Sequence, residues 1–283
     1  MRKISFLRQL VTQILLAITG LFVFLPIWGI ARLAFDGSLI GRPTEFRFFP
    51  KEWSITAFMR VLDKPYQSVD FQILLKNSLL VSIGAAAISI VFGLSLAYAF
   101  ARFRFPGRKP GLFSLLLTAV LPPVAFMTPL YIILGLMQIR TTLLALVIVY
   151  SAFAMPFSIW NMRAIFQAIP KELEEAAFLD GAGNFKTFLL VTLPLSLPSV
   201  AVTGLIAFLL AYSEFALGWL FVDKADNVTL AMSIYAMTQS WGGAQPWSYL
   251  GSLAIIMSIP VVVIFLILQQ TLIKRMVLGS IDN

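Results

Sequence analysis

A chain of 283 residues with 59% hydrophobic residues, 12% charged residues and a mean hydropathy of +0.90 is too apolar for a water-soluble domain of this size. Its net charge of +8 does not indicate nucleic-acid binding, because the basic residues cluster in short loops beside apolar runs, as anionic lipid and membrane insertion favour. The absence of cysteine and histidine excludes disulfides, thiol catalysis, imidazole bases and the commonest metal ligand. We therefore expect a membrane protein that is not an enzyme.

Six apolar runs are long enough to cross about 30 Å of hydrocarbon as helices that rise about 1.5 Å per residue. They lie at about residues 10–35, 73–100, 112–137, 142–165, 187–221 and 248–272. The first run follows Arg2, Lys3 and Arg8, but it is too long for a signal peptide and has no small-residue cleavage site. The sequence thus predicts an all-α membrane protein, a single transmembrane domain over residues 1–283 with six transmembrane helices.

The basic residues of the loops predict how these spans are oriented. The loop after the second span carries four basic residues and no acid: Arg102, Arg104, Arg108 and Lys109. The loop after the third span has Arg140 as its one basic residue, and the loop after the fifth span has Lys224. We therefore expect both termini and the loop 166–186 in the cytoplasm, and the long loop 36–72 outside.

The outer loop 36–72 contains more aromatic residues than a free linker would. They are Phe46, Phe48, Phe49, Trp53, Phe58, Tyr66 and Phe71. Two interpretations stay open, namely an aromatic belt at the lipid interface and a small folded platform that touches an external partner.

Small residues recur at every fourth position of the second span, at Ala85, Ser89, Gly93 and Ala97. Such a stripe allows a second helix to approach closely. It predicts helix packing and carries no further function.

Prolines punctuate the later spans, at Pro122, Pro123, Pro129, Pro156 and Pro260. Broken backbone at membrane depth is tolerated where it is buried in protein or faces a water-filled cavity. For any one proline a simple kink is an equally good interpretation. Taken together they favour a solute path through the third span, bordered by Pro122, Pro123, Pro129 and Tyr131, with Tyr212 and Glu214 of the fifth span on its other side.

Glu214 is the one acid well inside a predicted span. A charged group at the centre of a lipid-exposed helix costs about 2.5–3.5 kcal/mol on insertion scales, so Glu214 is expected inside the bundle or near the outer surface. A structural anchor and a group beside the solute path both remain open as its role.

One acidic stretch, residues 169–198, interrupts the apolar second half of the chain. Pro170 suits the first position of a helix, because its missing N–H would have no partner there. The first turns carry carboxylates that complement the helix dipole, at Glu172, Glu174 and Glu175. Gly181 stands where a left-handed helix end favours glycine, and a second helix is expected from near Asn184. A solvated connector between two spans is an equally simple interpretation of this stretch.

The ordered motifs of the chain resemble a family of transport proteins. The cytoplasmic EAA loop of ABC importer permeases looks like Glu175-Ala176-Ala177, Asp180-Gly181-Ala182, Leu193-Pro194-Leu195 and Pro198. Carbohydrate-uptake permeases also carry counterparts of Asn77-Ser78, residues 97–109, Pro129-Leu130-Tyr131, Pro156-Phe157 and Ile169-Pro170. Over roughly residues 70–275 the chain is similar to the maltose-type second permease subunit.

This resemblance implies one subunit of an importer in the bacterial cytoplasmic membrane, for a sugar, oligosaccharide or related polyol. A second, similar permease would complete the solute path, an extracytoplasmic binding protein would deliver the solute, and two cytoplasmic ATPase subunits would hold ATP and Mg²⁺. The chain itself is expected to bind no cofactor, no metal and no nucleic acid. Residues 181–187 carry Phe185 where a phosphate-binding loop has glycine.

The resemblance also implies a coupling helix between the fourth and fifth spans that docks on the ATPase. Its residues would be Glu172, Leu173, Glu175, Ala176, Ala177, Asp180, Gly181 and Ala182. Glu175 is expected to pair with a basic group of the ATPase, Ala176 and Ala177 to permit close packing, and Gly181 to permit the turn.

The chain departs from the family pattern in two places. Tyr212 and Ser213 replace the usual tryptophan and asparagine before Glu214, which leaves the local side-chain contacts open. The C-terminus lacks the glycine-rich stretch that often reaches toward the ATPase, so we do not count on a tail contact.

Two alternatives come from other classes of membrane protein. A secondary transporter would carry several intramembrane charges in paired repeats, where this chain has Glu214 and no detectable repeat. A membrane anchor without transport activity would not need proline-broken spans or a large outer loop.

Overall fold

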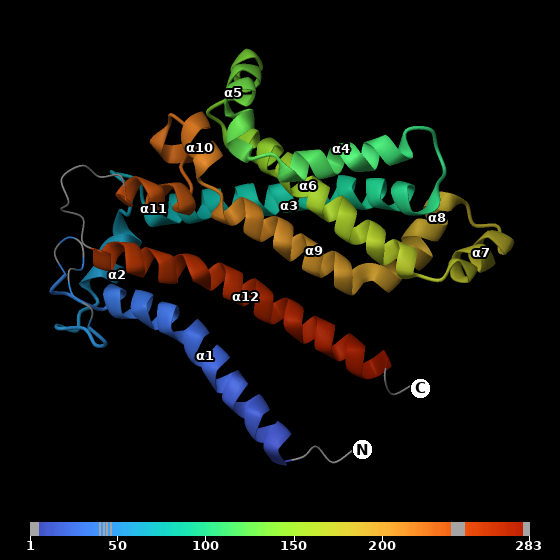
Figure 1. Ribbon diagram of the computed structural model, residues 1–283. Coiled ribbons are helices and arrows are strands. Elements are labelled where there is room, and N and C mark those ends of the chain that lie inside the picture. Colours follow the sequence, from blue (N-terminus) through green and yellow to red (C-terminus); the bar gives the residue numbers. More distant parts are fainter. Residues whose placement is uncertain are drawn as a thin grey trace. The chain divides into compact units, whose positions relative to one another are not determined.

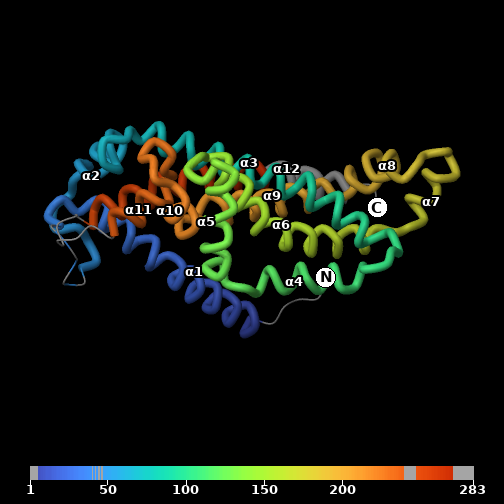
Figure 2. The backbone as a smooth tube through the Cα atoms, turned by 90° about the horizontal axis from the view of Figure 1, so that it is seen from above, coloured from blue at the N-terminus to red at the C-terminus, as the bar shows by residue number. Residues whose placement is uncertain are grey.

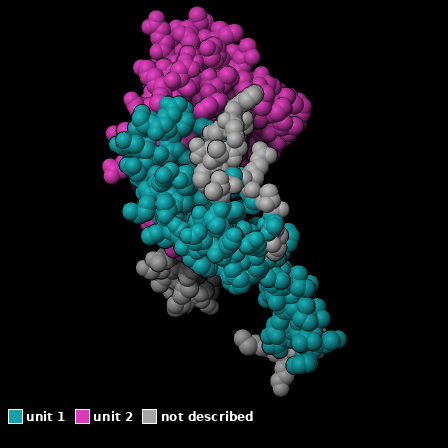
Figure 3. Space-filling model, turned by 90° about the vertical axis from the view of Figure 1, so that its left-hand side faces the viewer, with its two compact units in different colours: residues 1–71, 234–259 teal, residues 72–233, 260–283 magenta. Residues whose placement is uncertain are grey.

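The computed structural model describes residues 6–39, 41, 43, 45, 47–238 and 247–279. The regular elements of these residues are helices, and the only β pairs among them are two isolated bridges in the outer loop, Asp36 with Trp53 and Tyr66 with Val69 (Figure 1). The chain divides into two compact units, which Figure 3 colours separately: residues 1–71 with 234–259, and residues 72–233 with 260–283. The predicted all-α fold is confirmed.

The first unit contains α1, α2, the outer loop and parts of the last two helices. Its elements are α1 (Phe6–Ala34), α2 (Thr56–Asp63), the end of α11 (Leu230–Thr238) and the first part of α12 (Trp247–Gly279). Gly251 of α12 allows a close approach to α1, since a Cβ there would lie 2.9 Å from the backbone nitrogen of Ala34. The hydroxyl of Ser252 donates to the carbonyl oxygen of Ala34 at 3.3 Å, which fixes the same contact.

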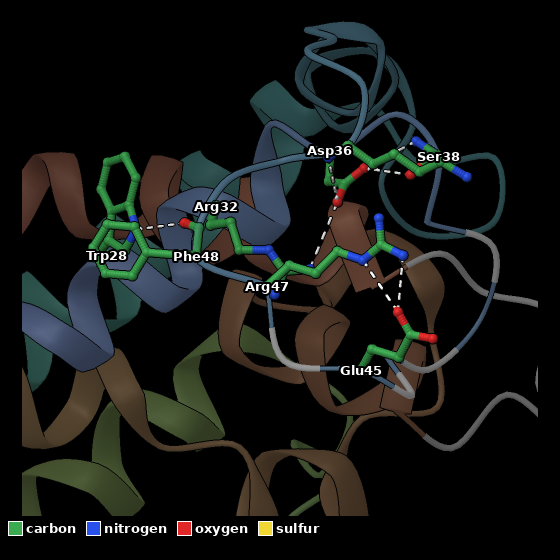
Figure 4. A network of polar contacts seen from close by, with 8 residues as sticks. Trp28, Arg32, Asp36, Ser38, Glu45, Arg47 and Phe48 are labelled. Carbon is green, nitrogen blue, oxygen red and sulfur yellow. Dashed lines mark hydrogen bonds and ion pairs between the residues drawn. The ribbon is translucent and has the colours of Figure 1, made fainter.

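The outer loop folds back on the end of α1 instead of running free (Figure 4). The indole Nε1 of Trp28 donates to the carbonyl oxygen of Phe48 at 2.8 Å, and the ring of Phe48 packs 5.7 Å from that of Trp28. Asp36 accepts from the hydroxyl of Ser38 at 2.6 Å and forms an ion pair with Arg32 at 3.6 Å. The described part of the loop is therefore folded onto α1, and the exposed Phe48, Phe49 and Trp53 leave both interpretations of its aromatic residues open. Phe46, which we counted among its aromatic residues, lies outside the described residues.

The second unit holds the remaining helices in one bundle. Its elements are α3 (Phe71–Arg102), α4 (Arg108–Val120), η1 (Pro123–Phe126), α5 (Met127–Leu136), α6 (Leu143–Ala168), α7 (Lys171–Leu179), α8 (Asn184–Thr187), η2 (Phe188–Thr192), α9 (Leu193–Ser213), α10 (Ala216–Phe221) and η3 (Ala225–Asn227). Helices α6 and α9 pack along each other, as Figures 1 and 2 show.

The small-residue stripe of α3 packs as predicted. The hydroxyl groups of Ser89 and Ser158 lie 2.9 Å apart, and a Cβ on Gly93 would lie 3.1 Å from that of Ser158. A buried cluster continues this contact between α3 and α6 toward α7, and it contains Leu94, Ala97, Tyr98, Phe100, Ile159, Met162 and Phe166. The small side chains Ser89 and Gly93 thus let α3 approach α6 closely at Ser158.

The predicted spans agree with the structure in number, and two of them differ in form. Among the described residues, five single helices are long and apolar enough to cross a membrane: Phe6–Ala34, Phe71–Arg102, Leu143–Ala168, Asn184–Ser213 and Trp247–Gln269. The expected span at 112–137 is a pair of helical segments bent by 103° at Leu121 and Pro122, and counting it as one span gives six. Adjacent prolines remove two N–H donors and clash with the preceding turn, so the helix cannot continue.

The expected fifth span at 187–221 ends earlier than predicted, at Ser213. Glu214 has extended backbone with ψ of 130°, and α10 is a separate short helix. Pro156 and Pro260, in contrast, lie inside continuous helices. The backbone is therefore broken at Pro122 and Pro123 and after Ser213, and not at every proline.

Candidate coupling helix and solute path

Helix α7 is a short, well-closed helix between the spans α6 and α9. It begins at Lys171, with Pro170 as the N-cap residue at ψ of 133°, one residue later than predicted. Proline is as harmless there as at the first helical position, because neither N–H has a partner within the helix. At the other end Gly181 has φ of +82°, and its N–H donates to the carbonyl oxygen of Phe178 at 3.0 Å.

Most of the predicted coupling residues are accessible on the surface of α7 and the turn after it. Glu172, Leu173, Glu175, Ala176, Asp180 and Gly181 are exposed, and Ala177 and Ala182 are half-buried. The same surface also exposes Phe178, Leu179 and Phe185, which the sequence analysis did not select. Leu179 is 89% exposed although it lies outside the spans. These residues could have been selected from the sequence, because they are large apolar residues in a loop that was predicted to lie in water.

Glu174 differs from the other acids of α7 because it points into the protein. Its side chain is 5% exposed and accepts from Nε of Arg102 at 3.0 Å, and the Arg102 side chain is 7% exposed. The hydroxyl of Thr192 donates to the same carboxylate at 2.6 Å. Nη2 of Arg102 also donates to the carbonyl oxygen of Ile169 at 2.9 Å. This pair was not predicted from the sequence. The available signal was that Arg102 stood in a loop that has no acidic residue to pair with it.

The predicted path residues of the third span lie around the broken helix pair. Pro122 and Pro123 form the break, and Pro129 lies in the first turn of α5. The ring of Tyr131, also on α5, lies 4.6 Å from the guanidinium carbon of Arg140. Arg140, which follows α5, also forms an ion pair with Asp223 in the loop after α10. Arg140 therefore links Tyr131 of α5 to that loop.

The predicted path residues of the fifth span are held in packed surroundings. Tyr212 is buried, and its ring stacks on Phe208 with 5.2 Å between the centroids. Glu214 is half-buried and accepts from the backbone N–H of Leu217 at 3.0 Å and of Gly218 at 3.3 Å. Since the first N–H groups of a helix have no partner within it, Glu214 satisfies two of them. These two hydrogen bonds fit the anchoring role, one of the two roles that the sequence left open.

The structure brings the two sets of path residues near each other through their helices, because α5 packs beside α10 (Figure 1). A half-open apolar hollow of about 180 Å³ lies between the broken pair and α6. Its lining is formed by Thr118, Phe126, Leu130, Val149, Ala152, Phe153 and Pro156. None of the predicted path residues belongs to that lining. In the part of the chain that the structure describes, no group of three or more acidic side chains is placed to hold a metal ion.

The family model of the binding-protein-dependent transport system inner membrane component matches residues 89–278. The chain belongs to this family. It is a permease subunit of an ABC importer, as the motifs of the α7 region indicated, and a multi-pass membrane protein. The family is named for its dependence on a binding protein, and a solved bacterial alginate ABC transporter is in complex with a periplasmic protein. The relatives of this chain are named as transport permeases.

Relatives match the permease over almost its whole length. The trehalose/maltose transport system permease protein MalG of Thermococcus litoralis is 30% identical over 97% of this chain and 96% of its own. The galactooligosaccharides transport system permease protein GanQ of Bacillus subtilis is 27% identical over 99% and 98%. A solved bacterial ABC transporter involved in the import of the acidic polysaccharide alginate superposes with a TM-score of 0.75 at 21% identity, covering 95% of this chain and 99% of that one. The fold of the permease is therefore that of importer transmembrane subunits.

Proposed function

We propose that this permease forms half of the solute path of an importer for a sugar, oligosaccharide or related polyol. The substrate class is supported by the names of relatives that match nearly the whole chain, which transport trehalose and maltose, maltodextrin and galactooligosaccharides. A second, similar permease completes the path, and an extracytoplasmic binding protein delivers the solute. ATP and Mg²⁺ bind to two separate ATPase subunits and not to this chain.

Helix α7 is the part of the permease that docks on the ATPase. The observation that carries this proposal is the mixed surface of α7, where exposed Leu173, Phe178 and Leu179 adjoin the exposed carboxylates Glu172 and Glu175. Large apolar side chains grouped outside the membrane mark a protein interface. Their burial on the ATPase supplies contact area, and Glu175 supplies an ion pair with a basic group.

We infer that this surface faces the cytoplasm. The basic loop after α3 is joined to α7 through Arg102 and Glu174, so both lie on one side of the membrane. Asn77 at the other end of α3 is bonded to the loop after α10, which lies on the opposite side. The excess of basic residues in the loop after α3 assigns its side to the cytoplasm.

Transport follows from two states of the permease pair. Closure of the ATPase subunits around ATP moves the two docking helices, and the bundle ends that carry them shift between inward-open and outward-open arrangements. The broken helix pair and the Glu214-capped helix α10 border the path that opens. Because the permease supplies no chemistry, its contribution is the coupling of these movements to solute access.

Topology and composition can be tested together on the purified assembly. Since the chain has no cysteine, single cysteines at Ser68 and at Ser240, which lies outside the described residues, are expected to react with an impermeant thiol reagent from outside. A cysteine at Gly107 is expected to stay protected. Purification in mild detergent should recover an ATPase and a sister permease, and the reverse labelling pattern or recovery of the permease alone would contradict the proposal.

Uptake by the reconstituted importer tests the substrate class. The ligand bound by the co-purified binding protein is expected to be a sugar, oligosaccharide or polyol, and uptake should require both that protein and ATP. Uptake driven by an ion gradient without ATP would favour the secondary transporter.

A further inference from the structure

The inward-pointing Glu174 of α7 has no place in a docking surface, yet it forms the best-connected polar group of that helix. Its carboxylate accepts from Arg102 at 3.0 Å and from Thr192 at 2.6 Å, and the hydroxyl of Thr192 is fully buried. Hydrogen bonds to a charged group are about twice as strong as neutral ones. A buried carboxylate with these partners is held firmly in one position.

These two partners come from two different parts of the second unit. Arg102 is the last residue of α3, and Thr192 is the last residue of the π-helical segment η2 that leads into α9. Arg102 also reaches the carbonyl oxygen of Ile169, which precedes α7. Glu174 and its partners thus join α7 to the ends of two membrane-spanning helices. Single π-helical turns inside helices are frequent at functional sites.

Aromatic rings pack beside this polar cluster on the side of the bundle. The ring of Phe188 in η2 lies 4.8 Å from that of Tyr98 on α3 and 6.1 Å from that of Phe166 on α6. The rings of Tyr98 and Phe166 are 5.9 Å apart. Close packing of large rings resists small sliding movements, because side chains in packed cores have no free volume to fill. Glu174 and its partners therefore lie beside tightly packed rings of α3, α6 and η2.

We propose that Glu174 is a positioning residue that fixes α7 to α3 and α9, so that a displacement of α7 moves the cytoplasmic ends of both helices as one body. The inference rests on the proposed docking of α7 on the ATPase and adds a separate element to it. Glu175 faces the ATPase and determines how tightly the ATPase binds. Glu174 determines how fully a movement of α7 is transmitted to α3 and α9. Loss of Glu174 contacts should leave docking intact and reduce transport per ATP hydrolysed.

A matched pair of substitutions at Thr192 separates positioning from simple packing. Thr192→Val keeps the shape of the side chain and removes the hydroxyl, whereas Thr192→Ser keeps the hydroxyl and removes a methyl group. In the complete reconstituted importer we expect Thr192→Val to lower solute uptake per ATP hydrolysed by about tenfold, the size expected for a lost hydrogen bond to a charged group. Thr192→Ser should retain most of the uptake, and both variants should co-purify the ATPase in the wild-type amount.

A distance measurement tests the one-body movement directly. Spin labels on cysteines at Arg104 after α3 and at Lys171 in α7, both exposed, are compared in the importer without nucleotide and with ATP trapped. A single distance, equal in the two states, is the expected result for the unsubstituted importer and for Thr192→Ser. In Glu174→Gln, which leaves Arg102 without its charged partner, the distance should broaden and differ between the two states.

Two outcomes would overturn the proposal. One is a label distance that changes between the nucleotide states in the unsubstituted importer, which decides the question even if no variant assembles. The other is equal coupling in Thr192→Val and Thr192→Ser. Failure of the docking proposal looks different, because the ATPase would then remain bound to Glu175→Lys whatever the label distance shows.

Discussion

The side-chain amide of Asn77 donates a hydrogen bond of 2.7 Å to the backbone carbonyl oxygen of Asp226, which lies 149 residues later in the chain. The same amide donates to the carbonyl oxygen of Val228 at 2.9 Å. The neighbouring hydroxyl of Ser78 accepts from the N–H of Leu230 at 2.8 Å. One end of α3 therefore holds the loop between α10 and α11 by its backbone, whatever side chains the loop carries.

Removal of this amide is expected to loosen the loop between α10 and α11. Asn77→Ala leaves the buried carbonyl oxygen of Val228 without a donor and should destabilise the permease by about 1–3 kcal/mol. Asn77→Asp keeps the size of the side chain but brings a carboxylate toward two carbonyl oxygens, so its effect should be at least as large. Thermal unfolding in detergent measures both, and a melting temperature equal to that of the unsubstituted protein would contradict this role.

A side chain at Gly218 is expected to displace the ends of the Met232 and Tyr150 side chains, because α10 lies close to both residues. A Cβ at this position would lie 2.3 Å from Cε of Met232 and 2.5 Å from the hydroxyl oxygen of Tyr150. Gly218→Ala should cost about 1–3 kcal/mol by overpacking. Gly204→Ala is the control, since its Cβ would meet Ile90 at 3.7 Å, an ordinary contact. Equal thermal stability of the two variants would show that the tight fit around Gly218 is absent.

The capping role of Glu214 predicts a graded response to substitution. Glu214→Gln keeps one acceptor oxygen for the N–H groups of Leu217 and Gly218, so most of the thermal stability should remain. Glu214→Ala removes both acceptors and should cost about 0.5–2 kcal/mol, as for other lost helix caps. Solute affinity for uptake should be nearly unchanged in Glu214→Gln. A large loss of uptake at unchanged stability would instead assign Glu214 to the solute path.

Acidification is expected to weaken the folded outer loop through Asp36. Burial raises the pKa of this carboxyl, but hydrogen bonds from the hydroxyl and N–H of Ser38 and from the N–H of Lys51, together with the charge of Arg32, hold the pKa below its usual value. The folded protein thus binds this proton less readily than the unfolded chain. Its stabilisation is present above the unfolded pKa of about 3.9 and disappears as the pH falls through the folded value.

The variant Asp36→Asn checks this pH dependence. Asparagine has no charge to lose, so the difference in melting temperature between the permease and the variant should be largest at neutral pH and shrink below about pH 4. A difference that stays constant from neutral to acid pH would show that the charge of Asp36 does not support the folded outer loop.

The spans and the α7 turn could be predicted because each rests on local sequence. A long apolar run predicts a span from its own residues. A glycine after a short amphipathic run, such as Gly181, likewise predicts a left-handed helix end. The break at Pro122 and Pro123 agrees with proline geometry, although the sequence predicted a single span at 112–137. The early end of α9 could not be predicted this way, because an apolar run continues past Glu214 and only the capping of α10 stops the helix there.

The contacts that join distant parts of the chain could not be predicted either, because they depend on residues far apart in the sequence. Glu174 and Glu175 are neighbours with equal charge and helix preference, and their sequence alone gives no measure of which one points inward. That is decided by Arg102, 72 residues earlier, and by Thr192 in the π-helical segment η2. Asn77 was recognised as part of a family motif, whereas its role in holding the backbone of the loop after α10 required the packed structure.

The turn after α7 is expected to depend on the backbone of Gly181 and not on the space around it. With φ of +82° and no heavy atom within 4 Å of an added Cβ, Gly181→Val should cost about 1–3 kcal/mol through backbone strain alone. Gly181→Asn should be milder, because asparagine visits this region more readily. The control Gly183→Val lies at φ of −79° with equally open surroundings. Substrate-stimulated ATP hydrolysis should fall in the order Asn then Val at position 181 and stay unchanged for Gly183→Val.

The central claim, that α7 docks on the ATPase, is tested most directly by the amount of ATPase that co-purifies with Glu175→Lys. This exposed residue lies outside the spans, so membrane insertion and pairing with the sister permease should persist. Reversal of its charge against a basic group of the ATPase should reduce the co-purified ATPase by at least about tenfold, whereas Glu175→Gln should give a smaller loss. ATPase recovered with Glu175→Lys in the same amount as with the unsubstituted permease, and with normal uptake, would contradict the docking of α7.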